Sequence, residues 1–178
     1  MIQKRALAKG RPRKRSSGKS ALLEDCVQSL GLLGFHEYGT NGSFQRAEVI
    51  NARYIIRNFP HESVYGTSGK KEALIVAPNG SGSFALDDDG MARVIMEAKW
   101  QESSGSVDEK LPYIWEAFRD SPVHNWVVVL DGRYWKTGRG TAAVKWLGRK
   151  AGLFDGRTLR VVDRKGFIDL AMKAWGQP

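Results

Sequence analysis

Cysteine and histidine are scarce in this sequence. It has one cysteine, Cys26, and three scattered histidines, His36, His61 and His124. A single cysteine cannot form a disulfide within the chain, so we expect a protein of the reducing cytoplasm. None of these four residues has the spacing of a recognisable zinc site, which excludes the common zinc-binding classes.

Long apolar runs are missing as well. No stretch approaches the roughly 20 apolar residues that a membrane-spanning helix needs, and no apolar signal core follows the basic residues near the start. We therefore expect neither a membrane protein nor a secreted one. The part of the chain that follows residue 19 is long enough to form a single domain that buries a core. We predict a disordered basic arm (residues 1–19) followed by one folded domain (residues 20–178).

Positive charge is concentrated in two blocks. Residues 1–20 contain eight Lys and Arg and no Asp or Glu, and residues 132–165 contain ten basic and two acidic side chains. Between them, residues 21–131 contain nine basic and sixteen acidic side chains. Separate basic stripes of this kind predict a polyanionic partner, and here we expect DNA.

The first block contains more than charge. The segment from Lys9 to Arg15 resembles an AT-hook, in which an Arg-Pro-Arg core lies extended along the minor groove of A·T-rich DNA. A plain polybasic arm would have almost the same composition and would bind phosphates without base preference. Under either reading the predicted DNA-binding side chains of the arm are Arg11, Arg13, Lys14 and Arg15.

The run from Val94 to Gln101 is typical of a strand that ends in an acid and a lysine. Residues two apart on a strand share a face. The carboxylate of Glu97 and the ammonium of Lys99 should therefore point together into one site, while Ala98 faces the other way into packing. Gln101 lies on the same face as Lys99.

A second acid is expected on a neighbouring strand, because a single carboxylate binds Mg²⁺ poorly. Residues 71–78 read as a strand that begins near Glu72, and the turn residues 79–82 end it. The chain then returns on residues 92–96, which predicts an antiparallel hairpin. In that hairpin Glu72 lies beside Glu97.

Two other positions compete for the role of the second acid. The cluster at residues 87–89, three consecutive aspartates before Gly90, can chelate a cation but is also typical of a solvated turn. Glu24, on the first predicted helix, is a further candidate or simply an exposed charge. The sequence favours Glu72 over both.

The pattern Glu72…Glu97-Ala98-Lys99 resembles the PD-(D/E)XK nuclease superfamily. The continuation through Trp100 and Gln101 to residues 104–110 is similar to nucleases of phages and restriction systems. The resemblance covers about residues 20–135 and departs from the usual motif in two ways: the first acid is Glu rather than Asp, and no Pro precedes it. It implies an α/β fold with a restriction-endonuclease-like mixed β-sheet core flanked by helices.

The resemblance also implies roles for the site residues. Glu72, Glu97 and a backbone carbonyl near Ala98 would bind Mg²⁺, with Mn²⁺ as an alternative, to polarise the scissile phosphate and activate a water. Lys99 would orient that water, and whether it also acts as the base depends on opposing effects of burial and of the two carboxylates on its pKa. Gln101 would hydrogen-bond the water or a phosphate oxygen. Nucleases of this type commonly act as homodimers.

The second basic block falls on a helix predicted from Thr141 to Gly152. We expect Trp146 on this helix to be buried. The side chains predicted to contact DNA phosphates there are Arg139, Lys145, Arg149 and Lys150.

The remaining elements follow from apolar periodicity and turn residues. We predict helices at residues 20–33, 108–119 and 166–175 and strands at residues 49–57, 126–130 and 159–162. A capping box at residues 106–109 should start the second of these helices, with Pro112 in its first turn or bending it. The strand at 126–130, a continuous apolar run, should be central in the sheet.

The sequence thus predicts a Mg²⁺-dependent DNA endonuclease. A restriction or homing-type enzyme that cuts specific duplex sites and a structure-specific enzyme such as a Holliday junction resolvase both remain open. A non-catalytic DNA-binding or architectural protein, in which Glu97 and Lys99 form only a structural pair, is the alternative from another class.

Overall fold

The computed structural model describes residues 18–38, 53–62, 68–78, 82–105 and 110–176. The order of elements is α1 (Lys19–Leu32), β1 (His36–Tyr38), β2 (Tyr54–Glu62), β3 (Ser68–Pro78), β4 (Met91–Trp100), α2 (Leu111–Arg119), β5 (Asn125–Asp131), the 3₁₀ turn η2 (Tyr134–Lys136), α3 (Gly138–Lys150), β6 (Gly152–Phe154), β7 (Arg157–Val162) and α4 (Arg164–Trp175). The predicted arm at residues 1–19 lies almost entirely outside the described residues.

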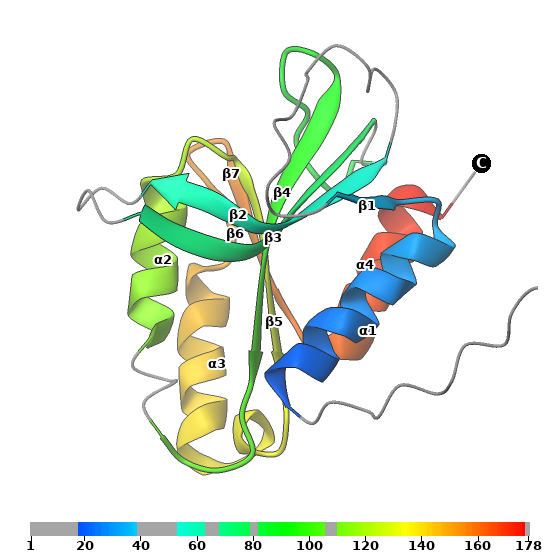
Figure 1. The fold of residues 1–178 in the computed structure, drawn as a ribbon. Helices are drawn as coiled ribbons and strands as arrows, with labels where there is room; N and C mark the ends of the chain where they lie inside the picture. The colour runs from blue at the N-terminus through cyan, green and yellow to red at the C-terminus, as the bar shows by residue number, and fades with distance from the viewer. Residues whose placement is uncertain (1–17, 39–52, 63–67, 79–81, 106–109, 177–178) are drawn as a thin grey trace, which may run out of the picture.

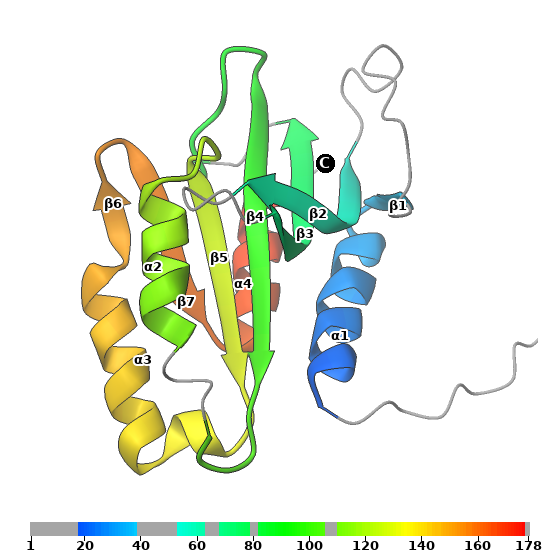
Figure 2. The same ribbon diagram turned by 60° about the vertical axis from the view of Figure 1, so that its left-hand side comes forward.

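Within the described residues, seven strands form one mixed sheet in the order β1-β2-β3-β4-β5-β7-β6. Strands β4, β5 and β7 run parallel to one another, whereas β3 is antiparallel to β2 and β4. Helices α1 and α4 cover one face and α2 and α3 the other (Figures 1 and 2). The prediction of an α/β fold with a mixed sheet flanked by helices is confirmed.

The central strand β5 is buried on both faces. Val127 and Val129 belong to the core beneath α1 and α4, and Trp126 and Val128 belong to the core beneath α2 and α3. A strand covered by helices on both faces reads as a continuous apolar run rather than an alternating one, as predicted for residues 126–130.

The hairpin of β3 and β4 forms as predicted. Its ladder runs from Pro78 opposite Met91 to Ala73 opposite Met96, and β4 remains paired with β5 as far as Trp100 opposite Asp131. The last residues of β4 therefore extend beyond the described pairing with β3. Past this point, β2 and β3 bend over the side of the sheet that carries α2 (Figures 1 and 2).

Two polar side chains, one of Asn125 and one of Arg53, connect separate parts of the fold through hydrogen bonds to backbone groups. The Asn125 side chain is fully buried, accepts a hydrogen bond from the Ala85 amide at 2.9 Å and donates to the carbonyls of Ala85 and Arg93 at 2.9 and 3.1 Å. Arg53 Nη1 donates to two helix-end carbonyls, Leu33 at 2.7 Å and Trp175 at 2.7 Å. Because carbonyls at helix C-termini lack intrahelical donors and carry partial negative charge, Arg53 stabilises the ends of α1 and α4 together.

Several predicted boundaries were wrong. Helix α1 begins at Lys19 rather than at a Ser20 cap, and α3 begins at Gly138 rather than Thr141. Helix α2 begins at Leu111 with proline in its first turn and Lys110 at its N-cap position, and the predicted capping box at residues 106–109 lies outside the described residues.

Two further differences concern strands and burial. The strand predicted to end near Arg57 continues to Glu62 and passes through Pro60. Trp146 packs against the core only in part and is not fully buried. The short strands β1 and β6 and the turn η2 were not predicted.

Candidate active site

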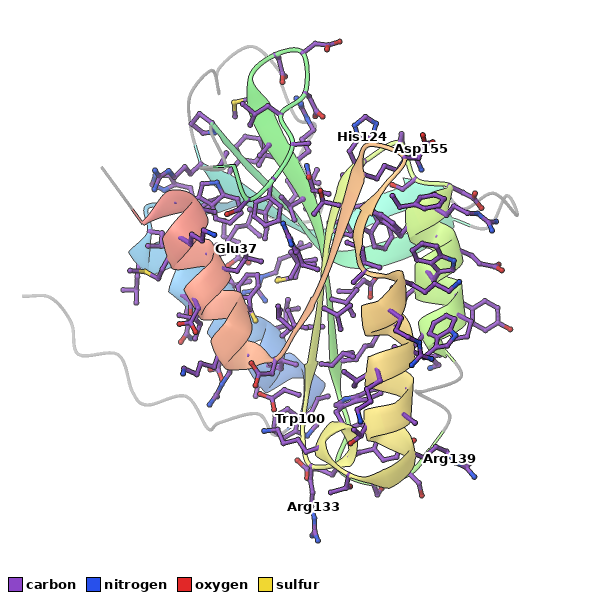
Figure 3. The ribbon with its side chains drawn as sticks, turned by 180° about the vertical axis from the view of Figure 1, so that it is seen from behind. Glu37, Trp100, His124, Arg133, Arg139 and Asp155 are labelled. Atoms are coloured by element: carbon purple, nitrogen blue, oxygen red, sulfur yellow. The ribbon has the colours of Figure 1, made fainter. Side chains whose placement is uncertain are left out.

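The last residues of β4 lie at the end of the sheet where the helices begin. The parallel strands β4, β5 and β7 all finish at this end, and α1, α2, α3 and α4 all start there (Figures 1 and 2). Figure 3 shows Trp100, Arg133 and Arg139 at this end and His124 and Asp155 at the opposite end. Carboxyl ends of parallel strands are the usual place for ligand sites in α/β sheets.

Glu97 and Lys99 point to one face and form an ion pair, as the strand periodicity predicts. Lys99 Nζ donates to Glu97 Oε2 at 2.6 Å. The Glu97 side chain is 5 % exposed and that of Lys99 is 18 % exposed. A carboxylate this deeply buried needs a partner, because leaving water costs an unpaired charge several kcal/mol. In the protein without a bound ion, Lys99 supplies such a partner.

Ala98 faces the opposite way. It is fully buried in the core beneath α1 and α4, whereas Ile95 and Leu130 on the Glu97 side belong to the core beneath α2 and α3. The side chain of Ala98 therefore contributes packing, and only its backbone carbonyl is available as the ligand predicted from the sequence.

Glu72 lies on the strand that pairs with β4. It directly precedes Ala73, which is opposite Met96, and Met96 directly precedes Glu97. The described ladder ends at that pair, one residue short of Glu72 and Glu97, so the pairing of Glu72 with Glu97 stays a prediction. The Glu72 side chain lies outside the described residues.

The described side chains alone do not complete a metal site. Among them, no three His, Cys, Asp or Glu residues lie together as a metal-binding group. The donors near Glu97 are nevertheless of the right chemistry for Mg²⁺, which prefers carboxylate, carbonyl and water oxygens and binds proteins through one or two carboxylates. A second carboxylate beside Glu97, as Glu72 would provide, fits this requirement.

Gln101 follows the end of β4 and is held by its loop. Its side-chain Nε2 donates to the Ser103 carbonyl at 2.6 Å. Its backbone amide donates to the Asp131 carbonyl at 3.0 Å, and its own carbonyl accepts from the Tyr134 amide at 3.1 Å. The described contacts of Gln101 are thus with its own loop, with the end of β5 and with η2.

The aspartate cluster at residues 87–89 is not brought to the site. Arg93 forms ion pairs with Asp87 and Asp89, both at 2.6 Å. The hydrogen bond from Arg93 lowers the pKa of Asp89 to about 2. These residues precede β4, whose first residue is on the order of 20 Å from Glu97 at a rise of about 3.3 Å per residue.

Glu24 is also separated from Glu97. Arg57 contacts Glu24 Oε2 at 2.9 Å and also pairs with Glu37 at 2.5 Å. Arg57 is opposite Ala73, whose side chain belongs to the core beneath α1. Glu24 therefore belongs to an ion-pair cluster on the opposite face of the sheet from Glu97.

The predicted DNA-binding side chains of α3 are exposed but spread along the helix. Arg139 is in its first turn, at the site end, whereas Lys145, Arg149 and Lys150 lie progressively farther along it. Lys150 Nζ lies 5.7 Å from the centre of the Trp115 ring. The predicted contacts of the arm, Arg11, Arg13, Lys14 and Arg15, lie outside the described residues.

Sequence reasoning missed the turn η2, which contacts the end of β4 directly. The indole Nε1 of Trp135 donates to the carbonyl of Lys99 at 3.2 Å, and Trp135 is buried. Gly132, directly after the buried strand β5, was a sequence signal for this contact. Glycine is often required where a turn brings two backbones close together.

Comparison with known proteins identifies one family. Residues 16–175 match the sequence model of the PD-(D/E)XK nuclease superfamily domain. No curated protein and no solved structure matches the chain. Of the helices in the described part of the chain, none combines the length and the apolar character that crossing a bilayer requires.

Proposed function

Because the chain belongs to the PD-(D/E)XK nuclease superfamily, we propose that it is a Mg²⁺-dependent DNA endonuclease whose site is built on Glu97 and Lys99. The observation that carries the proposal is the buried ion pair between these residues, 2.6 Å apart on one face of β4. Among the side chains whose burial the structure describes, Glu97 is the only charged one that is buried. Such a costly group, placed at the ligand-binding end of an α/β sheet, is typical of a functional site.

Glu97 and Glu72 would hold the divalent ion together with the backbone carbonyl of Ala98. An ion bound there polarises the scissile phosphate and makes a neighbouring water easier to deprotonate. Glu97 contributes a carboxylate oxygen from a buried position, where electrostatic interactions are stronger than in water. Its present partner, Lys99, would have to share that oxygen with the ion.

Lys99 would turn its ammonium group toward the substrate once the ion neutralises Glu97. In that position it orients the attacking water and offsets the negative charge that accumulates on the phosphate. Gln101 would assist by hydrogen-bonding the same water or a phosphate oxygen.

The charge around the site supports a nucleic-acid substrate. The four helix N-termini bring partial positive charge to the end of the sheet where β4 finishes, and the exposed side chains of Arg133 and Arg139 add full charges there. We propose that DNA phosphates bind at this end and that Lys145, Arg149 and Lys150 extend the contact along α3. Phosphate contacts of this kind position DNA without reading its sequence.

The arm would add affinity rather than chemistry. Eight positive charges in residues 1–19 should release counterions on binding DNA, so removing the arm should weaken binding and flatten its dependence on salt. If residues 9–15 act as an AT-hook, the loss should be greater on A·T-rich DNA than on G·C-rich DNA. Equal losses would assign the arm to general phosphate binding.

A homodimer would allow two sites to act on the two strands of a duplex. We include it in the proposal because small nucleases of this superfamily commonly work in pairs. Sedimentation equilibrium of the protein with and without DNA measures the assembly directly. A monomer on duplex DNA would favour nicking or a structure-specific activity over double-strand cleavage.

The central experiment is a cleavage assay. Purified protein is incubated with supercoiled plasmid, linear duplex and a four-way junction, in Mg²⁺, Mn²⁺ or EDTA. We expect cleavage only with a divalent ion, and the preferred substrate separates a site-specific enzyme from a junction resolvase. Both Glu97→Ala and Lys99→Ala should abolish cleavage, because one removes a metal ligand and the other the group that orients water.

Asp25→Ala provides a matched control. Asp25 also forms an ion pair, with Arg164 at 2.8 Å, but on the surface of α1 and away from Glu97, so this variant should cleave like the original protein. Full activity of Glu97→Ala or Lys99→Ala would remove that residue from the site. DNA binding without cleavage under every condition would instead support an architectural protein.

A further inference from the structure

We infer that Trp135 is a positioning residue that fixes the end of β4, and with it the backbone of the Glu97–Lys99 site. The inference rests on the proposed function and adds to it a residue that lies outside the superfamily motif. Trp135 is in η2, after β5, and contacts the site through a backbone carbonyl rather than through a reacting group.

Residues of η2 form hydrogen bonds with the backbone at both ends of the segment from Lys99 to Gln101. Trp135 Nε1 donates to the Lys99 carbonyl at 3.2 Å, and the Tyr134 amide donates to the Gln101 carbonyl at 3.1 Å. Thr141 Oγ1, on α3, donates to the carbonyl of Trp135 at 3.3 Å. The end of β4 is thus linked through η2 to helix α3.

These contacts matter because the described pairing of β4 with β3 stops just before Glu97. That pairing ends at Met96 opposite Ala73, whereas the pairing with β5 continues through Glu97 and Lys99 to Trp100. A change of about 1 Å in the position of a reacting group can lower a rate by about a hundredfold. Trp135 restrains the carbonyl of Lys99 from the β5 side.

Two glycines show how closely the backbones approach in this region. A Cβ atom on Gly132 would lie 2.3 Å from the Gln101 carbonyl oxygen, and one on Gly140 would lie 2.2 Å from the Tyr134 carbonyl oxygen. Backbone atoms cannot move aside as a flexible side chain does. Both positions therefore require glycine for η2 to remain against β4 and α3.

The test replaces Trp135 with Phe, which keeps an aromatic ring and removes the indole N–H. The matched control is Trp126→Phe. Trp126 is also buried and donates its Nε1 to a backbone carbonyl, that of Val123, at 3.2 Å, but Val123 precedes β5 at the opposite end of the strand from the site. Both variants lose one indole hydrogen bond in the same core.

Three quantities are measured for each variant: kcat for DNA cleavage, the Mg²⁺ concentration for half-maximal rate, and the affinity for Mn²⁺ by electron paramagnetic resonance without DNA. For Trp135→Phe we expect kcat to fall about tenfold and both metal measures to weaken severalfold, as for the loss of about one hydrogen bond. DNA affinity in EDTA should change less than twofold. Trp126→Phe should lower the melting temperature without changing either metal measure.

A second pair of variants tests the same contact from the backbone. Gly132→Ala would press on the Gln101 carbonyl, whereas Gly152→Ala has the same φ of 110° but no atom within 4 Å of its new Cβ. The two share the strain of an alanine in a left-handed conformation. Only Gly132→Ala should weaken Mn²⁺ binding and kcat, and this holds even if Trp135→Phe fails to fold.

The outcomes distinguish the inference from the proposed function. If the original protein cleaves no DNA, the proposed function fails, and Mn²⁺ affinity still decides whether Trp135 positions the site. If the original protein cleaves and Trp135→Phe matches Trp126→Phe in kcat and both metal measures, or Gly132→Ala matches Gly152→Ala, Trp135 has only a packing role.

Discussion

Breaking the ion pair between Glu97 and Lys99 should destabilise the protein in a strongly non-additive way. Lys99→Met leaves a carboxylate that is 5 % exposed without the ammonium now 2.6 Å away. Losing one partner of a buried pair costs about 3–5 kcal/mol. Because the Lys99 side chain is 18 % exposed, water reaches the pair, and we expect about 2–3 kcal/mol.

The reverse substitution should cost less. Glu97→Gln leaves an ammonium on a long, flexible side chain that can reach water, so about 1 kcal/mol is expected. The double variant lacks both charges of this pair and should also lose only about 1 kcal/mol. The coupling energy between the two positions is then about 2–3 kcal/mol, within the range for residues in direct contact.

Thermal unfolding in EDTA, followed by circular dichroism, measures these differences. At about 2–4 °C per kcal/mol for a chain of this size, Lys99→Met should melt roughly 4–12 °C lower, and the double variant should melt above it. Adding Mg²⁺ should raise the melting temperature of Lys99→Met, where the carboxylate no longer shares its oxygen with an ammonium, and leave Glu97→Gln unchanged. If the stability loss of the double variant equals the sum of the two single losses within about 0.5 kcal/mol, the reasoning is refuted. The interaction between Glu97 and Lys99 would then contribute nothing to stability.

Three other predictions follow from the structure. Glu72→Gln should abolish cleavage, whereas replacing residues 87–89 together by Asn should leave it largely intact, and the opposite result in the plasmid assay would move the metal to the aspartate cluster. Arg53→Met should lower stability to urea by about 2 kcal/mol, because two helix-end carbonyls lose a charged donor, whereas an unchanged midpoint would mean that water replaces the arginine at no cost. Burial raises the pKa of the Cys26 thiol from 9.0 to about 12, so iodoacetamide at pH 8 should alkylate it only after unfolding, and rapid alkylation of the folded protein would contradict this burial. Since the unfolded thiol ionises first, its contribution to stability is complete below about pH 9 and declines as the pH rises toward 12.

Strand periodicity predicted the part of the site that is local in sequence. Glu97 and Lys99 share a face because alternation along a strand is a geometric property of the backbone, and the burial of Ala98 on the other face follows from the same rule. The antiparallel pairing of β3 with β4 was also predictable, because turn residues separate two apolar runs of similar length.

Features that depend on distant contacts were not predictable in this way. Trp135 and Lys99 are 36 residues apart, and no periodicity relates them. The predicted helix boundaries were wrong where tertiary contacts override local preference. Helix α3 starts at Gly138 although glycine disfavours helices, and Gly140 is required because the Tyr134 carbonyl oxygen would lie 2.2 Å from a Cβ atom there. Pro60 lies within β2 because, in the described pairing, residues after Arg57 pair with β3 alone. This part of β2 is therefore an edge strand, where a proline without an N–H group is tolerated.

The direction of the first and last helices sets where a tether can be attached. The chain enters α1 at Lys19, at the end of the sheet where β4 finishes, while α4 ends at Trp175 near the opposite end (Figure 1). A targeting module fused ahead of Lys19 would be held on the side of the proposed site, with its reach set by the intervening linker. Attachment after Trp175 would hold the molecule on a surface with its site facing outward, which suits measurements on single DNA molecules.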